Sequence, residues 1–381
     1  MSNVSSSNGL GKYPKLRFQG FSDPWQTVRI GEIYAERSER GAEDMELLSV
    51  TMNDGVKMRS DIEGKDNSSE DKSNYKIVRA GDMVYNSMRM WQGANGISPW
   101  DGIVSPAYTV LKPRIPISNG FFAALFKTYR LVNEFRKNSQ GMTSDTWNLK
   151  YPQIETIKTS IPALAEQEQI SEFLMSLEKR IEKQRTLVET LKKYKRGLLS
   201  AVFSRKLTFG AYEEWQETTI SECLQYEQPQ KYIVETEQYD DGYSTPVLTA
   251  NKAFILGYTN ESTGIYNKGD VIIYDDFTMD MKYVTFPFKV KSSTIKMLTP
   301  RQGFDLYFAY ALLQSLDLQP EGHQRSYISK VEPMIVKIPC YEEQVEISNF
   351  LQKCDFRVQQ EEETLTKLMQ LKSGLLQSLF I

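Results

Sequence analysis

Residues 161–203, IPALAEQEQISEFLMSLEKRIEKQRTLVETLKKYKRGLLSAVF, occur a second time as residues 338–380, IPCYEEQVEISNFLQKCDFRVQQEEETLTKLMQLKSGLLQSLF. The two copies align without a gap at a constant offset of 177, and 15 of the 43 aligned pairs are identical. A long internal repeat indicates a pseudo-symmetric architecture. The sequence therefore predicts two equivalent halves that share this segment.

Both copies have the pattern of a long amphipathic helix. Apolar residues recur at steps of three and four, as in Ile170, Phe173, Leu174 and Leu177. The last proline before each expected helix stands at its upstream edge, at positions 162 and 339. We expect helices over 166–203 and 343–381, the first of them about 55 Å long at 1.5 Å per residue.

Amphipathic helices of this length must bury their apolar stripes, and each copy is the simplest partner for the other. Helices from two halves related by a pseudo-twofold axis would pack as an antiparallel coiled coil. The expected packing residues are Phe173, Leu177, Ile181, Leu191 and Leu198 in the first helix and Phe350, Cys354, Val358, Leu368 and Leu375 in the second.

The repeat continues outside the helices, but less regularly. The segments 15–18 and 206–209 precede Trp25 and Trp215 at nearly equal spacing, whereas the middle regions differ in length. Each middle region has one helical candidate (120–138 and 304–318), and β-like runs stand between turn signals at 75–78, 83–85, 107–111, 271–274, 283–286 and 294–298.

These patterns predict an α+β protein with two pseudo-symmetric globular domains, each followed by a long helix. The expected division is an N-terminal tail with a repeated segment, a first domain, a central helix, a second domain and a C-terminal helix, over 1–24, 25–160, 161–204, 205–337 and 338–381.

Composition is that of a globular protein, with 40% hydrophobic and 25% charged residues. The apolar runs are too short to span a bilayer, and the Ser/Asn/Gly-rich start lacks the apolar core of a signal peptide. Three cysteines without ligand spacing suit a reducing compartment, so we expect a cytoplasmic protein. Residues 178–206 hold ten basic and three acidic residues, which indicates either a solvated helix face or a surface for an acidic partner such as the DNA backbone.

Catalytic motifs are missing from the sequence. The one histidine, His323, cannot build a Ser-His-Asp or Cys-His constellation or a His-rich metal site, and no phosphate-binding Gly-rich loop is present. The stretch 61–65 lacks the hydrophobic strand that a nuclease site needs, and Asp275, Asp276 and Asp280 are more typical of a solvated turn than of a cation site. We expect no catalytic residue, no metal and no cofactor.

The chain resembles the specificity subunits of type I restriction-modification systems over nearly its whole length. The segments that carry the resemblance are 14–18, 25–26, 30–33, 81–84, 161–162, 166–170 and 195–199, with 269–272, 338–339, 343–344 and 372–376 in the second half. The resemblance implies two target-recognition domains, each of which reads half of a bipartite double-stranded DNA site. It also implies that the helices set the spacer and dock two modification (methyltransferase) subunits, and that cleavage belongs to restriction (endonuclease/translocase) subunits.

Base-reading residues are expected in polar loops, because bases are read mainly by Arg, Lys, Asn, Gln, Ser and Thr. The candidates are Asn86, Ser87, Arg89, Gln92, Thr143, Asn148, Lys289, Lys291, Ser292, Gln324 and Arg325. Ordinary loop packing or capping remains an alternative for each. Two other functions stay open: a free-standing DNA-binding regulator, which would bind tightly without partners, and a coiled-coil adaptor, which would show no salt-dependent DNA binding.

Overall fold

The computed structural model divides into two compact units, which we describe separately. Unit 1 comprises residues 1–185 and 363–381, and unit 2 comprises residues 186–362. The structure describes residues 13–41, 44–52, 55–64, 68–143, 146–210, 212, 214–251, 253–316, 318–320 and 325–381, and the backbone of residues 2 and 3. The helices α5 (Leu164–Phe203) and α8 (Tyr341–Leu379) each contribute one part to each unit, whereas the sequence-based division gave each helix a region of its own.

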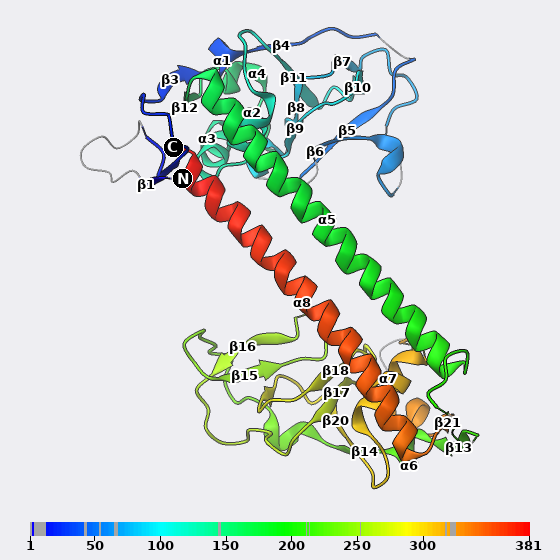
Figure 1. Cartoon of the computed structure of the whole chain (residues 1–381). Coiled ribbons are helices and arrows are strands. Elements are labelled where there is room, and N and C mark those ends of the chain that lie inside the picture. The colour runs from blue at the N-terminus through cyan, green and yellow to red at the C-terminus, as the bar shows by residue number, and fades with distance from the viewer. Residues whose placement is uncertain are drawn as a thin grey trace. The chain divides into compact units, whose positions relative to one another are not determined.

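Unit 1 is built on a four-stranded antiparallel sheet of order β4-β11-β8-β9 (Figure 1). Its strands are β1 (Ser2–Asn3), β2 (Leu16–Arg17), β3 (Gln26–Arg29), β4 (Tyr34–Glu36), β5 (Leu48–Thr51), β6 (Gly55–Met58), β7 (Lys76–Val78), β8 (Met83–Asn86), β9 (Asn95–Ile97), β10 (Gly102–Val104), β11 (Tyr108–Pro113) and β12 (Lys158–Ile161). Its shorter helices are α1 (Ile30–Ile33), η1 (Arg59–Asp61), η2 (Met90–Gln92), α2 (Asn119–Leu125), α3 (Tyr129–Asn138) and α4 (Tyr151–Ile154).

Unit 2 repeats this plan with a sheet of order β14-β20-β17-β18. Its strands are β13 (Gln216–Thr219), β14 (Leu224–Glu227), β15 (Thr245–Leu248), β16 (Ile255–Thr259), β17 (Val271–Asp275), β18 (Met281–Val284), β19 (Lys289–Val290), β20 (Ile295–Pro300) and β21 (Ile335–Ile338). Its shorter helices are α6 (Ile220–Cys223), η3 (Pro229–Tyr232), α7 (Leu306–Ser315) and the π-helical turn η4 (Tyr327–Val331). A three-stranded sheet, β16-β15-β19, has no counterpart among the described residues of unit 1 and has its own hydrophobic cluster.

Backbone hydrogen bonds extend the repeat beyond the sequence match. Ile30 N donates to Ile157 O in unit 1 (2.9 Å), and Ile220 N donates to Met334 O in unit 2 (3.1 Å). The two acceptors differ by 177 positions, which is the offset of the helical repeat. The exact repeat thus begins upstream of residue 161, although few side chains there are identical.

The expected helix over 120–138 is wrong in one respect, because it is two helices, α2 and α3. Thr128 has extended backbone angles (φ −67°, ψ 143°) and its hydroxyl accepts from Leu131 N at 3.4 Å. A threonine at this position caps a new helix instead of continuing the old one. In unit 2, α7 is a single helix of 10 residues.

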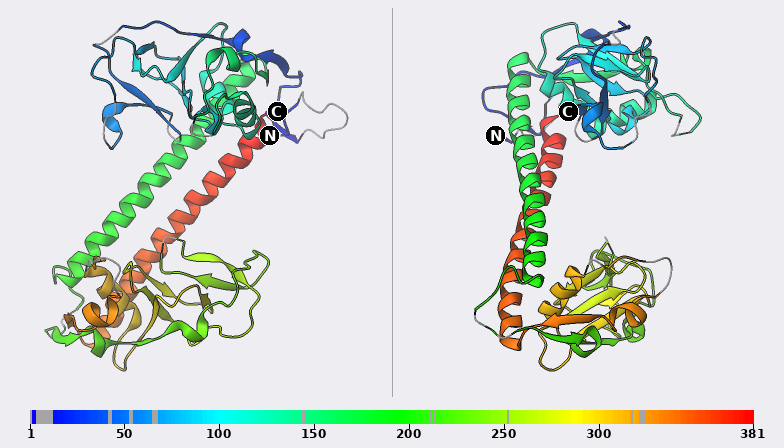
Figure 2. Two further views of the ribbon diagram at one scale, coloured as in Figure 1. Left: turned by 180° about the vertical axis from the view of Figure 1, so that it is seen from behind. Right: turned by 90° about the vertical axis from the view of Figure 1, so that its right-hand side faces the viewer.

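The long helices pack in opposite directions, as expected, and one ion pair occurs in both units. In unit 2, Lys192 pairs with Glu362 (2.8 Å) and Lys195 with Asp355 (2.5 Å), so the partner number falls along α8 as the number rises along α5. In unit 1, Lys372 pairs with Glu178 at 2.6 Å. The repeat maps position 178 onto 355 and 195 onto 372, so the same pair forms twice with the helices exchanged. Figure 2 shows the ribbons of α5 and α8 from two further sides.

Each long helix also ends in an equivalent aromatic anchor. Phe380 lies with its ring centroid 6.3 Å from that of Trp25 in the unit 1 core, and Phe203 lies 6.1 Å from Trp215 in unit 2. Edge-on aromatic contacts of this length are stabilising. The ends of the two helical repeats are therefore part of the domain cores.

The expected packing residues divide into two groups. Leu177, Ile181 and Leu375 are buried in the unit 1 core, and the half-buried ones are Phe173, Leu191, Leu198, Phe350, Cys354, Val358 and Leu368. In the unit 2 part of α5 the buried residues are Val188, Leu199 and Val202. Leu199 and Val202 belong to the same hydrophobic core as α7, so this part of α5 turns its buried face toward the domain. Leu199 therefore takes the buried position that was expected for Leu198. Among the described residues, no helix is long and apolar enough to cross a membrane.

Candidate nucleic-acid interface

The repeated Glu-Gln dipeptide fixes the start of each long helix. Glu166 is 1% exposed and accepts from Arg17 Nε (2.8 Å) and Nη2 (2.7 Å). Gln167 accepts from Ser118 N (3.1 Å) and donates to Pro162 O (2.9 Å). These bonds tie the helix to the segment before it and to the domain, so the dipeptide is structural.

Unit 2 forms the same junction with a cation from another position. Glu343 accepts from Arg205 Nη1 (3.0 Å) and from Trp215 Nε1 (3.2 Å), as Glu166 accepts from Trp25 Nε1 (3.4 Å). The sequence repeat aligns Arg17 with a threonine, so sequence reasoning could not pair Arg205 with Glu343. Gln344 repeats the second part of the junction by accepting from Asp305 N (3.0 Å) and donating to Pro339 O (3.1 Å).

Beyond this junction, loops of unit 1 converge at the end of strand β8. Ser87 N donates to Ala107 O (3.1 Å), and Leu149 N donates to Ser87 O (2.9 Å). The Asn86 Oδ1 atom accepts from Met88 N (3.0 Å) and shapes the first turn after the strand. The loop after β8 (87–94) and the described parts of a second loop (139–143 and 146–150) are thereby joined, and we call them together the unit 1 loop surface.

Aromatic and basic side chains gather on this surface. The rings of Trp91 and Trp147 meet edge-on at 5.3 Å, and the guanidinium of Arg136, from α3, lies 5.5 Å from the centre of the Trp147 ring. Around them lie five of the expected base-reading residues: exposed Arg89 and Thr143, and half-buried Asn86, Gln92 and Asn148. The Asn148 Oδ1 atom is buried and has no hydrogen-bond partner among the described residues.

An equivalent scaffold exists in unit 2. Asp276 N donates to Thr294 O (2.9 Å), and Ser326 N donates to Asp276 O (3.1 Å), which reproduces the bonds of Ser87. Leu149 and Ser326, the donors of the second bond, again differ by 177 positions. We call the segments 275–282, 291–294 and 325–327 the unit 2 loop surface.

Three expected residues lie on the unit 2 loop surface. Lys291 pairs with Glu237, the Ser292 hydroxyl accepts from Thr294 N (3.2 Å), and Arg325 is exposed. Tyr274 lies behind this surface, where its hydroxyl is 3.3 Å from Ser326 Oγ and burial raises its pKa to about 12. Its neutral hydroxyl therefore supports the loop at physiological pH.

Two of the proposed base-reading residues are buried and cannot reach a ligand from these positions. Ser87 is 5% exposed and its hydroxyl bonds Thr109 Oγ1 at 2.8 Å. Lys289 is 1% exposed, pairs with Glu261 (2.5 Å) and donates to Thr263 O (2.8 Å). We exclude both from the interface because their polar atoms are already satisfied inside the domain. Gln324 lies outside the described residues.

The acidic cluster of unit 2 also has a structural role. Asp275 Oδ1 accepts from Phe277 N (2.9 Å) and Thr278 N (3.0 Å), as Asn86 does in unit 1. Asp276 Oδ1 accepts from Ser326 N (3.0 Å), and its other oxygen pairs with buried Lys296 (3.4 Å). Within the ranges described, no group of three or more His, Cys, Asp or Glu side chains could hold a metal ion.

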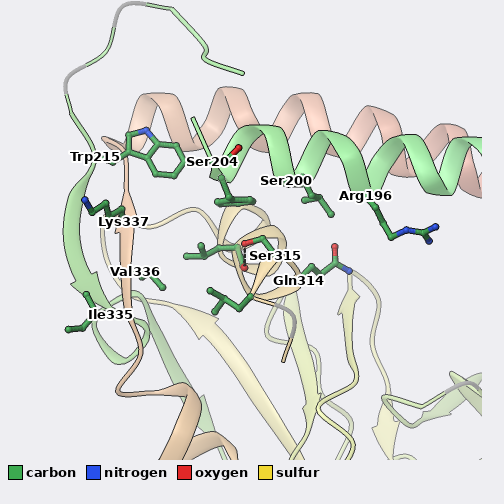
Figure 3. A pocket seen from close by; sticks show the side chains of 13 residues that line it. Arg196, Ser200, Ser204, Trp215, Gln314, Ser315, Ile335, Val336 and Lys337 are labelled. Carbon is green, nitrogen blue, oxygen red and sulfur yellow. Dashed lines mark hydrogen bonds between the residues drawn. The ribbon is translucent and has the colours of Figure 1, made fainter. Parts of the chain in front are cut away.

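A pocket of about 580 Å³ lies in unit 2 at the end of α5 (Figure 3). It presents the hydroxyls of Ser200, Ser204 and Ser315 beside Trp215. No carboxylate, histidine or cysteine is among the described side chains that line it, and Lys337, which does line it, pairs with Glu217 at 3.7 Å. The hydroxyls of Ser204 and Ser315 donate to backbone carbonyls of Ala201 and Leu312. The described lining thus shows no serine that is hydrogen-bonded to a side-chain base.

Sequence reasoning missed the contribution of α3 to the unit 1 loop surface. Leu131 and Phe135 are the buried residues of this helix, whereas Tyr129, Arg130 and Arg136 are exposed. The signal in the sequence was the spacing of apolar and basic residues in 129–138, which gives this segment one buried and one basic face. The expectation of a single helix over 120–138 concealed it.

Comparisons with known proteins agree with this architecture. The sequence profile of the family described as "Type I restriction modification DNA specificity domain" matches residues 22–192 and 212–370. The type I restriction enzyme EcoR124I/EcoR124II specificity subunit of Escherichia coli is 45% identical over 144 residues, which are 36% of this chain and 35% of that protein. The aligned part thus spans about a third of the relative's length.

Solved structures show the same fold. One is a type I restriction-modification system S subunit from M. genitalium, with a TM-score of 0.64 and 14% identity over 97% of this chain and 99% of that chain. Another comes from work titled as the complex assembly and conformational transition of the type I R-M system, with a TM-score of 0.53 and 16% identity over 92% of this chain and 96% of that one. The family profile matches most of the chain, in two copies, and the chain belongs to the family of type I restriction-modification DNA specificity domains.

Proposed function

We propose that this chain is the DNA sequence-recognition subunit of a type I restriction-modification complex in the cytoplasm. Each unit reads one half of a bipartite double-stranded DNA site, and the long helices set the spacer. Methyl transfer and cleavage belong to two modification subunits and to restriction subunits. The chain itself contributes no catalytic residue.

The observation that carries this proposal is one loop scaffold, built twice, with different side chains. The hydrogen bonds of Ser87 in unit 1 and Asp276 in unit 2 are equivalent. Their surroundings differ, with Trp91 and Arg89 in unit 1 and Thr278 and Asp280 in unit 2. Phosphate contacts position a protein on DNA and side chains at base edges give specificity, so a fixed frame with exchangeable side chains suits the reading of two different half-sites.

The helices offer equivalent surfaces for two modification subunits. Tyr194 of α5 is 63% exposed in unit 2, and Leu371 of α8 is 51% exposed in unit 1. The repeat aligns these two positions. Repeat-related exposed side chains provide two equivalent contact points, which fit two copies of one partner.

An exchange of recognition domains tests the proposal. Residues 25–160 are replaced by the equivalent region of a relative, and the variant is expressed with its modification subunits. Sequencing of methylated DNA should show that one half of the recognised site changes and the other half stays. A change in both halves would contradict independent reading, and a site that stays the same would contradict reading by this domain.

The alternative functions give different results in simpler assays. A free-standing regulator would bind a specific DNA sequence tightly as the purified chain alone. A coiled-coil adaptor would bind no DNA in a salt-dependent manner, with or without modification subunits.

A further inference from the structure

We propose that the two units divide DNA binding unequally: the unit 1 loop surface and α3 form a phosphate clamp that supplies most of the salt-dependent affinity, whereas unit 2 reads its half-site with less attraction for phosphate. This inference rests on the proposed function, because it assigns different shares of DNA binding to the two recognition domains. Four observations carry it.

The first observation is that α3 has no counterpart in the part of unit 2 that the structure describes. From the last residue of α2, Leu125, to Leu149 the chain runs 24 residues. From the last residue of α7, Ser315, to the equivalent Ser326 it runs 11. Both routes end at the same hydrogen bond of the scaffold, so α3 is an addition to a shared frame.

The second observation is the exposed face of α3. Tyr129 is 81% exposed, and Arg130, Arg136 and Lys137 are also exposed. Lys137 pairs with Glu134 of the same helix, whereas Arg130 has no acidic partner among the described residues. Arginines on one helix face without carboxylates to neutralise them are suited to bind phosphates.

The third observation is that this face is coupled to the loop after β8. The guanidinium of Arg136 lies over Trp147, and Trp147 contacts Trp91. A side chain on Gly93 would meet Val132 of α3 at 3.4 Å, so helix and loop pack directly. A guanidinium stacked on an aromatic ring is already oriented and keeps N–H donors free for a phosphate.

The fourth observation is local charge. Among the described residues, the unit 1 segments 86–94 and 127–150 present six basic side chains and one acidic one at exposed or half-buried positions, a net charge of +5. The corresponding unit 2 segments 275–282 and 316–331 present three basic side chains and one acidic one among their described residues, a net charge of +2, because Asp275 and Asp276 are buried. The described surface around the unit 1 scaffold thus carries three more positive charges than the described surface around the unit 2 scaffold.

This asymmetry predicts how affinity depends on salt. Each phosphate contact releases counterions and contributes about 0.9 to the slope of log K against log salt. Cations of unit 1 should therefore account for most of the slope of the whole complex. Base-specific bonds from unit 2 should change specificity while they leave the slope nearly unchanged.

The test uses the full chain in complex with its modification subunits and a fluorescent duplex that carries the site found by methylation sequencing. R130Q/R136Q removes two cations from unit 1, and K282Q/R325Q is the matched variant of unit 2. Fluorescence anisotropy gives the dissociation constant between about 50 and 200 mM salt, the range over which phosphate contacts are resolved. We expect the slope to fall by roughly 1.8 for the unit 1 variant, from two lost contacts, and by less than about 0.5 for the unit 2 variant.

A third variant separates positioned charge from charge alone. W147A keeps Arg136 but removes the ring that orients it, so affinity should fall several-fold while the slope stays within about 0.5 of the parent complex. Equal slope changes in the two charge variants, or a larger change in unit 2, would overturn the inference. If the parent complex binds this duplex no better than a scrambled one, the proposed function fails instead, and hydrogen exchange of each variant shows whether its domains remain folded.

Discussion

Replacement of Glu166 by glutamine is the sharpest perturbation that the junctions allow, because its repeat partner Glu343 provides a matched control. Glu166 and Arg17 form a bidentate ion pair with side chains 2% and 4% exposed. E166Q leaves the guanidinium buried without a counterion. Loss of one partner from a buried ion pair costs about 3–5 kcal/mol.

The same change in unit 2 should cost less. The Arg205 side chain is 38% exposed, so water can solvate its charge when Glu343 becomes glutamine. Both glutamines can still accept from a tryptophan, Trp25 in unit 1 and Trp215 in unit 2, so the tryptophans do not distinguish the two variants. We expect E343Q to cost roughly 1–2 kcal/mol, between the ranges for exposed pairs and for a lost charged hydrogen bond.

Urea unfolding followed by hydrogen-exchange mass spectrometry measures the two units separately. Peptides from α2 report on unit 1, and peptides from α7 report on unit 2. R17M/E166Q should recover part of the loss, because it removes the buried charge that E166Q leaves unpaired. Equal losses for the two single variants would refute the argument, and so would a greater loss in unit 2, because burial of the arginine is the one factor assigned to the difference.

Three further predictions follow from the helices and the cysteines. L375A, in the unit 1 core, should lower the stability of that unit by about 2–5 kcal/mol, whereas L198A, at a half-buried position, should cost under half of that. The two losses are compared as shifts of the urea midpoint, measured by hydrogen exchange. Insertion of four residues near Glu182, about one helical turn, should keep both half-sites and lengthen the unread spacer in methylation sequencing, and an unchanged spacer would show that the helices do not set it. Iodoacetamide at pH 8 should modify exposed Cys340 first and leave Cys223 intact, since Cys223 is buried and its pKa is raised to about 12; peptide mass mapping at early times checks the order.

The repeat predicted much of the fold because it is encoded by local periodicity. The expected helix over 166–203 is α5, which begins two residues earlier, at Leu164. Strands β7, β8, β11, β17 and β20 lie where β-like runs were expected. Apolar residues repeat every 3.6 positions along a helix and every 2 positions along a strand when one face is buried. Each segment therefore carries its own secondary-structure signal, without reference to the rest of the chain.

Tertiary contacts explain the differences. From the sequence, Lys289 was expected to be exposed, because charged side chains are rarely buried. The parallel pairing of β15 with β19 buries it, and Glu261, 28 residues away in sequence, neutralises it. Arg205 likewise supplies the cation for Glu343, although the repeat aligns Arg17, the cation for Glu166, with Thr208. No local pattern encodes a partner that arrives from another element.

The two halves of the chain therefore share side chains at the helix junctions, but only backbone geometry at the loop surfaces. Glu166, Gln167 and their counterparts bond to the domains with nearly the same atoms, so a substitution there would detach a helix from its domain. At the loop surfaces the shared element is a pair of backbone hydrogen bonds, which any side chain permits. An addition as large as α3 can enter beside such bonds without disturbing the frame. Side chains that face a ligand are thus free to differ between the units, while those that hold the helices are not.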